Sequence, residues 1–206
     1  MKIKQIINSI FTSNTYVVDD KIDAVSLIDI GDIQPIIDYL NKEKKYVRFV
    51  FLTHTHYDHI YGIRELIRYY PDCIVYTSSF GKDALKSDKL NFSRYHNDPI
   101  ILSGNNIEAL HEGDKIELSA DINLEVLETP GHDKSCLTYK IGNNLFSGDS
   151  YIPGLKVIAS FPNSNKVDAE NSKERIKSLA EGMNLYPGHG DAYIDYHSCS
   201  EKRKDN

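Results

Sequence analysis

The segment Thr53–His59 (THTHYDH) limits what this chain can fold into more than any other feature, because four potential metal ligands occupy six positions. Residues two apart point the same way in an extended chain, so His54 and His56 can converge on one ion. Asp58 and His59 follow where the chain turns into a helix, and there they can face a second ion. Imidazole and carboxylate together suit Zn²⁺, iron or Mn²⁺. The segment therefore predicts a metal site between a strand and a helix.

The alternative interpretation of this segment is a polar loop that caps the following helix, with Asp58 as the N-cap. Capping, however, needs one acceptor. Three histidines packed here without a ligand would leave several ring nitrogens without partners. We therefore favour metal binding.

Three further candidate ligands follow glycine turns at the ends of apolar strands: His132, Asp149 and His189. Glycine lets the backbone turn sharply and approach an ion without a Cβ clash, and function at the carboxyl ends of strands is usual in α/β folds. Together with the first segment, these residues place five of the eight histidines in one proposed site. The other three are expected to be surface or loop residues: His96, His111 and His197.

Short β-branched segments and amphipathic segments come in two batches along the chain. The first batch predicts strands at Lys4–Ser9, Asn14–Asp19 and Ala24–Ile30, a helix opening at Gly31–Asp32, a strand at Tyr46–Thr53, a helix over Asp58–Tyr70, a strand at Cys73–Thr77 and a helix over Phe80–Lys86. The segment Asn91–Ser103 lacks clear periodicity. The second batch predicts strands at Lys115–Leu118, Ile122–Glu128, Cys136–Ile141 and Asn144–Ser147, a helix over Asp168–Glu181 and a short strand at Leu185–Tyr186.

This order of elements predicts an α/β fold in which two mixed sheets pack face to face with helices outside, a four-layer αββα sandwich. The length of 206 residues fits one domain. We expect that domain over residues 1–200 and a frayed tail at residues 201–206.

Charge and apolar patterning argue against several partners. The formal net charge of −6 disfavours nucleic acid, because phosphate binding needs a basic face. No apolar run reaches the roughly 18 residues that a membrane span needs, and the N-terminus does not look like a secretory signal. The three cysteines are widely spaced and form no disulfide framework, which favours a reducing compartment. We expect a cytoplasmic protein that acts on a small-molecule substrate, and the sequence leaves its oligomeric state open.

The motifs THTHYDH, TPGH, SGDS and YPGHG resemble, in order and approximate spacing, the metal-binding motifs of the metallo-β-lactamase superfamily over nearly the whole chain. The resemblance implies the αββα fold and two divalent metal ions, with zinc expected and iron or manganese as the alternatives. It also implies a division of the ligands. The first ion would take His54, His56 and His132, the second would take Asp58, His59 and His189, and Asp149 would bridge both.

Asp149 resembles the glyoxalase II, lactonase, phosphodiesterase and flavodiiron branches of the superfamily. Through the TPGH and GDS motifs and an NFS element at Asn91–Ser93, the sequence is most similar to small glyoxalase II-like hydrolases. This resemblance implies hydrolysis of a thioester of the hydroxyacylglutathione type by a metal-bridging hydroxide. Asp58 would then be catalytic, because it could orient the hydroxide and receive its proton.

Three departures from the glyoxalase II pattern lead us to expect a re-lined pocket. We expect the C-terminal helical region that helps to hold glutathione in that family to be missing, because 17 residues follow His189. Asp133–Cys136 replaces the family's Thr-x-Gly pattern, and Ser150–Lys156 lacks its usual arginine.

The candidate substrate contacts are Tyr57, Tyr151 and Lys156, since Tyr57 lies inside the metal motif and the other two directly follow Asp149. The competing interpretations are a cover over the helix start for Tyr57, core packing for Tyr151 and a solvated surface position for Lys156. Cys136 is either a redox-sensitive thiol near the site or a small buried apolar residue.

Other functions share this motif set and remain open. The alternatives are a lactonase, a phosphodiesterase or nuclease, an iron-dependent oxidoreductase of the persulfide dioxygenase or flavodiiron type, and a non-catalytic metal-binding or scaffold protein. Metal content and a substrate panel distinguish them.

Overall fold

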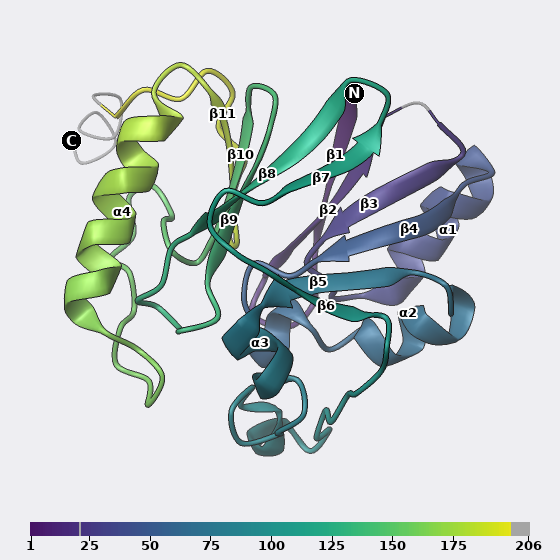
Figure 1. Ribbon diagram of the computed structural model, residues 1–206, viewed down its shortest axis with the longest axis horizontal. Coiled ribbons are helices and arrows are strands. Elements are labelled where there is room, and N and C mark those ends of the chain that lie inside the picture. The colour runs from purple at the N-terminus through teal and green to yellow at the C-terminus, as the bar shows by residue number, and fades with distance from the viewer. Residues whose placement is uncertain (21, 199–206) are drawn as a thin grey trace.

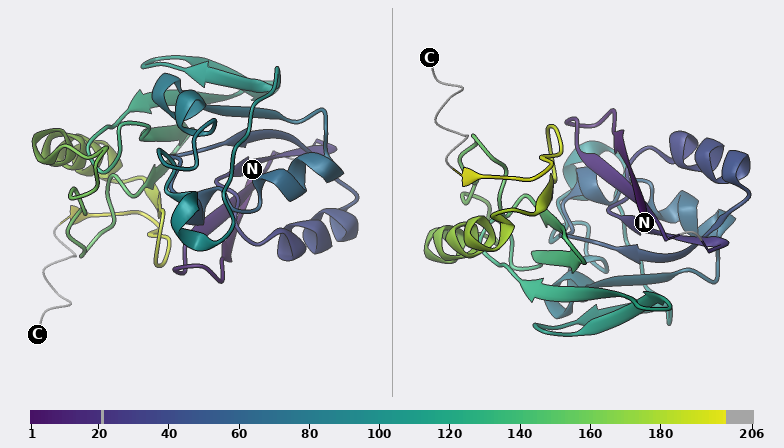
Figure 2. Two further views of the ribbon diagram at one scale, coloured as in Figure 1. Left: turned by 90° about the horizontal axis from the view of Figure 1, so that it is seen from below. Right: turned by 90° about the horizontal axis from the view of Figure 1, so that it is seen from above.

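Two β-sheets pack face to face in the computed structural model, and helices cover their outer faces (Figure 1). The model describes residues 1–20 and 22–198, so the tail expected at residues 201–206 lies outside the described residues. Seen from below and from above, α1 (Ile33–Glu43) and α2 (Ile63–Tyr69) lie beyond one sheet, and α4 (Lys166–Ala180) lies beyond the other (Figure 2). The prediction of two mixed sheets in a four-layer αββα sandwich is confirmed.

The first sheet has six strands in chain order, and its pairing changes from antiparallel to parallel. The strands β1 to β3 pair antiparallel, and the strands β3 to β6 pair parallel. The bounds are β1 (Lys2–Ile7), β2 (Asn14–Asp19), β3 (Ala24–Ile28), β4 (Tyr46–Phe51), β5 (Ile74–Ser78) and β6 (Ile107–Leu110).

The second sheet has five strands in the order β11-β10-β9-β8-β7. Its pairs are antiparallel except for β10 and β11, which run parallel. The bounds are β7 (Lys115–Ser119), β8 (Ile122–Glu128), β9 (Leu137–Ile141), β10 (Asn144–Gly148) and β11 (Asn184–Pro187).

The helices lie in the connections between strands. Asn165 starts the longest of them, because its side-chain oxygen accepts hydrogen bonds from the backbone N–H groups of Val167 and Asp168. The α-helices are α1 (Ile33–Glu43), α2 (Ile63–Tyr69), α3 (Ser79–Ala84) and α4 (Lys166–Ala180), and the 3₁₀ turns are η1 (Tyr57–His59) and η2 (Ser93–His96). No described helix is both long and apolar enough to span a bilayer.

Side chains alternate along the strands between three apolar layers. On β2, Val17 packs toward α1 and α2, whereas Tyr16 and Val18 pack between the sheets. On β10, Phe146 packs between the sheets and Leu145 packs toward α4. Burial of apolar surface in these layers stabilises the fold by about 25 cal/mol per Å². A shift of one residue in the pairing of a strand would move its apolar side chains to the wrong face, so the alternation also fixes the register.

The sequence-based element bounds are within two residues of the observed ones, with two exceptions. The strand β6 was not predicted. The helix predicted over Asp58–Tyr70 is divided into η1 and α2. The division lies just before α2, because backbone groups there bond to the neighbouring loop: the N–H of Ile30 donates to the carbonyl of His59 at 3.0 Å, and the N–H of Gly62 donates to the carbonyl of Ile30 at 3.3 Å.

Four strands of the two sheets end toward one edge of the sandwich, where hydrogen bonds join the sheets. The backbone N–H of Leu137 on β9 donates to the carbonyl of Thr53, which follows β4, at 2.7 Å. The hydroxyl of Tyr139 donates to the carbonyl of Leu52, also at 2.7 Å. The loops that follow β4, β8, β10 and β11 are therefore held close together.

Gly131, in the loop after β8, is predicted to be essential for docking α4. Its φ is +136°, and a Cβ there would lie 2.1 Å from the backbone nitrogen of Ala169 in α4. Gly131→Ala should lower the free energy of unfolding by more than the roughly 1–2 kcal/mol typical of a left-handed L-residue, as measured by urea denaturation.

Gly113→Ala is the matched control, because Gly113 also has a positive φ (+82°) but a Cβ there would meet nothing within 4 Å. Equal losses of stability in the two variants would contradict a docking role for Gly131.

Candidate metal centre

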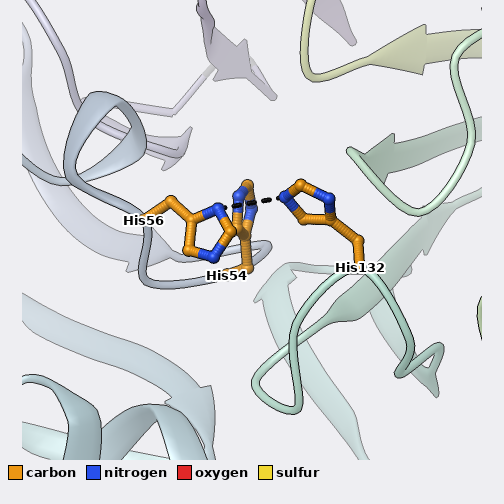
Figure 3. Close-up of side chains that lie close together, drawn as sticks. All are labelled: His54, His56 and His132. Atoms are coloured by element: carbon orange, nitrogen blue, oxygen red, sulfur yellow. Dashed lines mark hydrogen bonds between the residues drawn. The ribbon is translucent and has the colours of Figure 1, made fainter. Parts of the chain in front are cut away.

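All seven predicted ligands meet at the edge where the sheets are joined. They form three overlapping groups, and within each group one ligand atom per residue lies within 4.8 Å of the others. The groups are His54, His56 and His132; His54, His59 and Asp149; and Asp58, His59 and His189. In Figure 3 the rings of the first group face one another, two from the loop after β4 and one from the loop after β8.

The turn of the chain after β4 separates the two halves of the THTHYDH segment. His56 is still extended (φ −65°, ψ 149°) and precedes the 3₁₀ turn η1. Its Nδ1 lies 3.0 Å from Nε2 of His132. The turn carries Asp58 and His59 toward His189, whose Nε2 is 3.4 Å from Oδ2 of Asp58. The expectation that the second pair faces a different direction agrees with this arrangement.

Asp29 orients the two fully buried histidines. Its carboxylate accepts hydrogen bonds from the backbone N–H and the hydroxyl of Thr53 at 2.6 and 2.7 Å, and it lies 2.8 Å from Nδ1 of His59. The Thr53 hydroxyl is also 3.1 Å from Nδ1 of His54. Both histidines are thereby left with Nε2 facing the centre, an arrangement typical of metal ligands.

The two histidines of the later loops are held by backbone carbonyls. Nδ1 of His132 lies 2.7 Å from the carbonyl of Ile158, and Nδ1 of His189 lies 3.0 Å from the carbonyl of Phe11. An acceptor on one ring nitrogen fixes the tautomer and presents the other nitrogen to a ligand.

The segment that replaces the Thr-x-Gly pattern holds the remaining histidine. Oδ2 of the buried Asp133 lies 3.4 Å from Nε2 of His56. The other carboxylate oxygen of Asp133 accepts hydrogen bonds from Ser135, whose hydroxyl accepts the backbone N–H of Thr55. This departure from the family pattern therefore ties the loop after β8 to the THTHYDH loop.

Several polar atoms at the centre are buried without a partner, which fits a metal ion. Among residues 1–20 and 22–198, His54 Nε2, His59 Nε2 and Asp149 Oδ1 have no hydrogen-bond partner. The same holds for His56 Nε2 and Asp133 Oδ2, which meet only as an ion pair at 3.4 Å. Buried polar atoms are nearly always paired, and a missing partner calls for an ion or a water. Imidazole nitrogens with carboxylate oxygens are the donors that Zn²⁺, iron and Mn²⁺ accept.

The charges of the centre are strongly coupled. Burial would raise the pKa of Asp149, but His59 and His189 outweigh it and hold that pKa well below its usual range. Burial would lower the pKa of His59, but Asp58 and Asp29 raise it to about 9. Burial would also lower the pKa of His189, but hydrogen bonds to Asp149 and Asp58 raise it to about 10.

The model of the metallo-beta-lactamase superfamily matches residues 9–189, a range that contains every residue of this centre. The chain belongs to the metallo-β-lactamase superfamily.

Relatives within the superfamily bear the name hydroxyacylglutathione hydrolase. The protein of Tolumonas auensis is 25% identical over 87% of this chain and 62% of its own length. Hydroxyacylglutathione hydrolase 1 of Vibrio vulnificus is 28% identical over 88% of this chain and 63% of its own length. This chain thus spans less than two thirds of either relative.

Solved structures of the superfamily support the fold. The crystal structure of BLEG-1 B3 metallo-beta-lactamase has a TM-score of 0.86 and 23% sequence identity, covering 100% of this chain and 98% of that one. At this identity the likeness establishes the architecture alone.

The three candidate substrate contacts of this superfamily member differ in position. Tyr57 is 7% exposed and lines a cavity at the centre, and Lys156 is exposed and lines a second one. For Tyr151, the structure favours the core-packing interpretation over a substrate contact. Its side chain is 2% exposed, packs in the layer beneath α4 and hydrogen-bonds the hydroxyl of Tyr196, so it is a core residue.

The structure also places Cys136 and His96, for which the sequence supports only general expectations. Burial raises the pKa of the Cys136 thiol well above its usual range, so the interpretation as a small buried residue is favoured over a reactive thiol. His96 was expected in a surface or loop position. It is the last residue of the 3₁₀ turn η2, and its ring stacks on Tyr57 at 4.2 Å and lines the same cavity. His111 and His197 are exposed, as expected.

Asp29 and Asp133 are the residues of the centre that sequence reasoning missed. The sequence does mark Asp29, because this acidic residue stands between the apolar residues Ile28 and Ile30 directly after β3. Asp133 directly follows a predicted ligand. Neither contact can be read from spacing, since Thr53 and His56 are distant in sequence from the acids they meet.

We predict that Asp29→Asn weakens zinc binding by roughly 10- to 100-fold, the usual loss when the partner of a metal-binding histidine is changed. An amide still accepts a hydrogen bond, but it lacks the charge that orients His59. The affinity is measured by competition with a chromogenic chelator.

Asp19→Asn is the matched control, because Asp19 is also buried but pairs with Lys45 at 2.7 Å, away from the centre. A comparable loss of zinc affinity in both variants would show that Asp29 acts only on stability.

Metal binding by this chain should release protons. The pKa of His59 is about 9 and that of His189 about 10, and both lie above the ordinary histidine value of 6.5. Both rings are therefore protonated at pH 7 in the metal-free protein. A metal binds the neutral ring, so the apparent affinity should rise as pH increases from 6.5 toward 9 and 10. Calorimetry at pH 7 in buffers of different ionisation enthalpy measures the protons released, and a buffer-independent heat would contradict the prediction.

Proposed function

We propose that this chain is a binuclear metal-dependent hydrolase that cleaves thioesters, and that its substrates resemble hydroxyacylglutathione. The observation that supports it most is the set of seven converging side chains with buried, unpartnered ligand atoms. The names of the relatives in Tolumonas auensis and Vibrio vulnificus support the thioester substrate.

Two ligand sets share one carboxylate in this proposal. Asp149 Oδ2 lies 3.6 Å from Nε2 of His132 and 3.4 Å from Nε2 of His189, and Oδ1 lies 3.6 Å from Nε2 of His59. One carboxylate that contacts histidines of both sets is suited to bridging two cations. The first set is His54, His56 and His132, and the second is Asp58, His59 and His189.

Zinc is the metal we propose, with iron or manganese as the alternatives that the same donors accept. When bound, a pair of such ions lowers the pKa of water and polarises a carbonyl oxygen. The chain's own residues fix the donor positions beforehand, since each histidine ring has a protein acceptor or carboxylate at its outer nitrogen.

Asp58 is the proposed catalytic residue. Burial would raise its pKa, but His59 and His189 outweigh that effect and lower it, so the side chain is a carboxylate near neutral pH. Its Oδ2 lies 3.4 Å from Nε2 of each histidine. From this position the carboxylate can orient the attacking water and accept its proton.

Lys156 is the proposed contact for an anionic part of the substrate. It lines a cavity of about 320 Å³ together with His132, Asp149 and His189. A flexible ammonium at the rim of the centre suits the carboxylates of a carrier thiol such as glutathione.

We propose a cytoplasmic location and a small-molecule substrate as part of the same function. The described cysteines, Cys73 and Cys136, are free and buried, as expected in a reducing compartment. Cys199 lies outside the described residues.

Elemental analysis and a substrate panel test the proposal. The protein loaded with zinc should hold two ions per chain and hydrolyse S-lactoylglutathione faster than a lactone or bis(p-nitrophenyl)phosphate. Asp149→Asn should reduce zinc content and thioester turnover together, because the amide cannot serve both ligand sets.

Asp38→Asn, on the exposed face of α1, is the control that should retain both properties. Two tightly held ions in Asp149→Asn would refute a bridging role. Iron in the purified protein with oxygen consumption, or faster phosphodiester cleavage, would refute the thioesterase.

A further inference from the structure

The cleft over the metal centre has two arms that meet at His132, Asp149 and His189. One arm, of about 320 Å³, contains Lys156. The other, of about 390 Å³, is lined mainly by rings, and we call it the aromatic arm. Its rings outside the proposed ligands are Phe11, Tyr57, Phe92, His96 and Phe161.

The aromatic arm is built by three loops that are far apart in sequence. Phe11 comes from the loop between β1 and β2, Phe92 from the loop after α3, and Phe161 from the loop before α4. The ring centroids of Phe92 and Phe161 are 5.6 Å apart, and the centroids of Phe11 and His96 are 5.7 Å apart. Such ring contacts give the arm an aromatic wall in two parts, one of Phe92 and Phe161 and the other of Phe11, His96 and Tyr57.

This wall begins at the metal ligands themselves. The centroids of Phe92 and Phe161 each lie 5.0 Å from that of His56, and the centroid of Phe161 lies 5.7 Å from that of His132. A group bound in the arm would therefore lie directly beside ligands of the proposed first ion.

The arm offers no ammonium or guanidinium group to an anionic carrier among the described residues. Among the described residues that line it there is no lysine or arginine, and its carboxylates, Asp58 and Asp149, are proposed metal ligands. A tripeptide thiol with free carboxylates would lose hydration here without gaining a lysine or arginine partner. Lys156 in the other arm is the better place for that half of the substrate.

Two of the three phenylalanines are held in a backbone conformation that bulky residues rarely adopt. The φ of Phe11 is +50° and that of Phe92 is +61°. The side chain of Asn91 keeps the second loop in place, because its amide donates to the carbonyls of Ala84 and Ile100 at 3.1 and 2.9 Å. Such conformations persist where the surroundings fix them, and they are frequent at ligand sites.

We infer that the aromatic arm binds an uncharged ring or branched alkyl group on the acyl half of the substrate. The inference rests on the proposed thioester hydrolysis and specifies its substrate as a thioester whose acyl group is larger and more apolar than lactoyl. Rings stack on the phenylalanines while the scissile carbonyl lies over the centre.

A matched pair of thioesters tests this substrate class. S-Mandeloylglutathione and S-lactoylglutathione share the carrier and the 2-hydroxyl group and differ by a phenyl in place of a methyl. The wild-type, zinc-loaded protein should show a kcat/KM at least about tenfold higher for the mandeloyl compound, since even one methylene in an apolar pocket changes this ratio by roughly 10- to 200-fold. A ratio near one with measurable turnover would overturn the inference and leave the proposed function intact.

Variants of the exposed ring residues test the arm itself. Phe161 is 38% exposed and Phe11 is 64% exposed, so truncation to alanine should not unfold the chain. Phe161→Ala and Phe11→Ala should each lower the mandeloyl-to-lactoyl ratio several-fold. Tyr95→Ala is the matched control, because Tyr95 lies in the neighbouring 3₁₀ turn η2, is 71% exposed and does not line the arm. An unchanged ratio in both phenylalanine variants would overturn the inference.

A binding measurement separates this inference from the proposed activity. Mandelate and lactate share the α-hydroxy carboxylate, so calorimetric affinities compare the phenyl with the methyl without any turnover. Mandelate should bind at least about tenfold more tightly, and Phe161→Ala should reduce this preference. A preference of this kind in a protein that hydrolyses no thioester would support the arm while refuting the thioesterase. Equal affinities for the two acids would overturn the inference.

Discussion

The burial of polar side chains at the edge where two sheets meet is the constraint on which the rest of the structure depends. Imidazoles and carboxylates are costly to bury unless each atom has a partner. Asp29 shows how the chain meets this requirement, because its one carboxylate orients both Thr53 and His59. Several of the ligand atoms that face the centre keep no hydrogen-bond partner, and these atoms are suited to bind cations.

The two sheets hold this edge together without supplying chemistry themselves. Alternating apolar side chains fill three layers, and the aromatic contacts between the sheets extend to the strands that carry the ligands. The stacked rings of Phe146 and Tyr186, at 4.8 Å, lie on the parallel strands β10 and β11 that lead to Asp149 and His189. The ligand loops are thus short extensions of a packed core, which limits how far they can move apart.

The sequence predicts the layers and the ligand cluster because both depend on local patterns. Alternation of side chains marks the strands, and a glycine before each of His132, Asp149 and His189 marks the loops. It does not predict Asp133 or the aromatic arm, since these arise from contacts between loops that are distant in sequence. Strand β6 was missed for a similar reason: four residues with weak periodicity become a strand by pairing with β5.

The two arms of the cleft would allow one metal centre to accept a substrate whose two halves differ in chemistry. The apolar arm built by Phe11, Phe92 and Phe161 lies beside His56, whereas Lys156 lies in the opposite arm. Loops tolerate replacement better than the sheets that support them, so specificity can change while the centre is kept. The arm residues are where we place the acyl preference of the proposed thioesterase.

Anomalous diffraction from crystals of the zinc-loaded protein, recorded at the zinc edge, tests the central claim most directly. The account predicts two peaks, one among His54, His56 and His132 and the other among Asp58, His59 and His189, with Asp149 in contact with both. Absence of zinc peaks among these seven residues, or zinc held by other residues, would contradict the account.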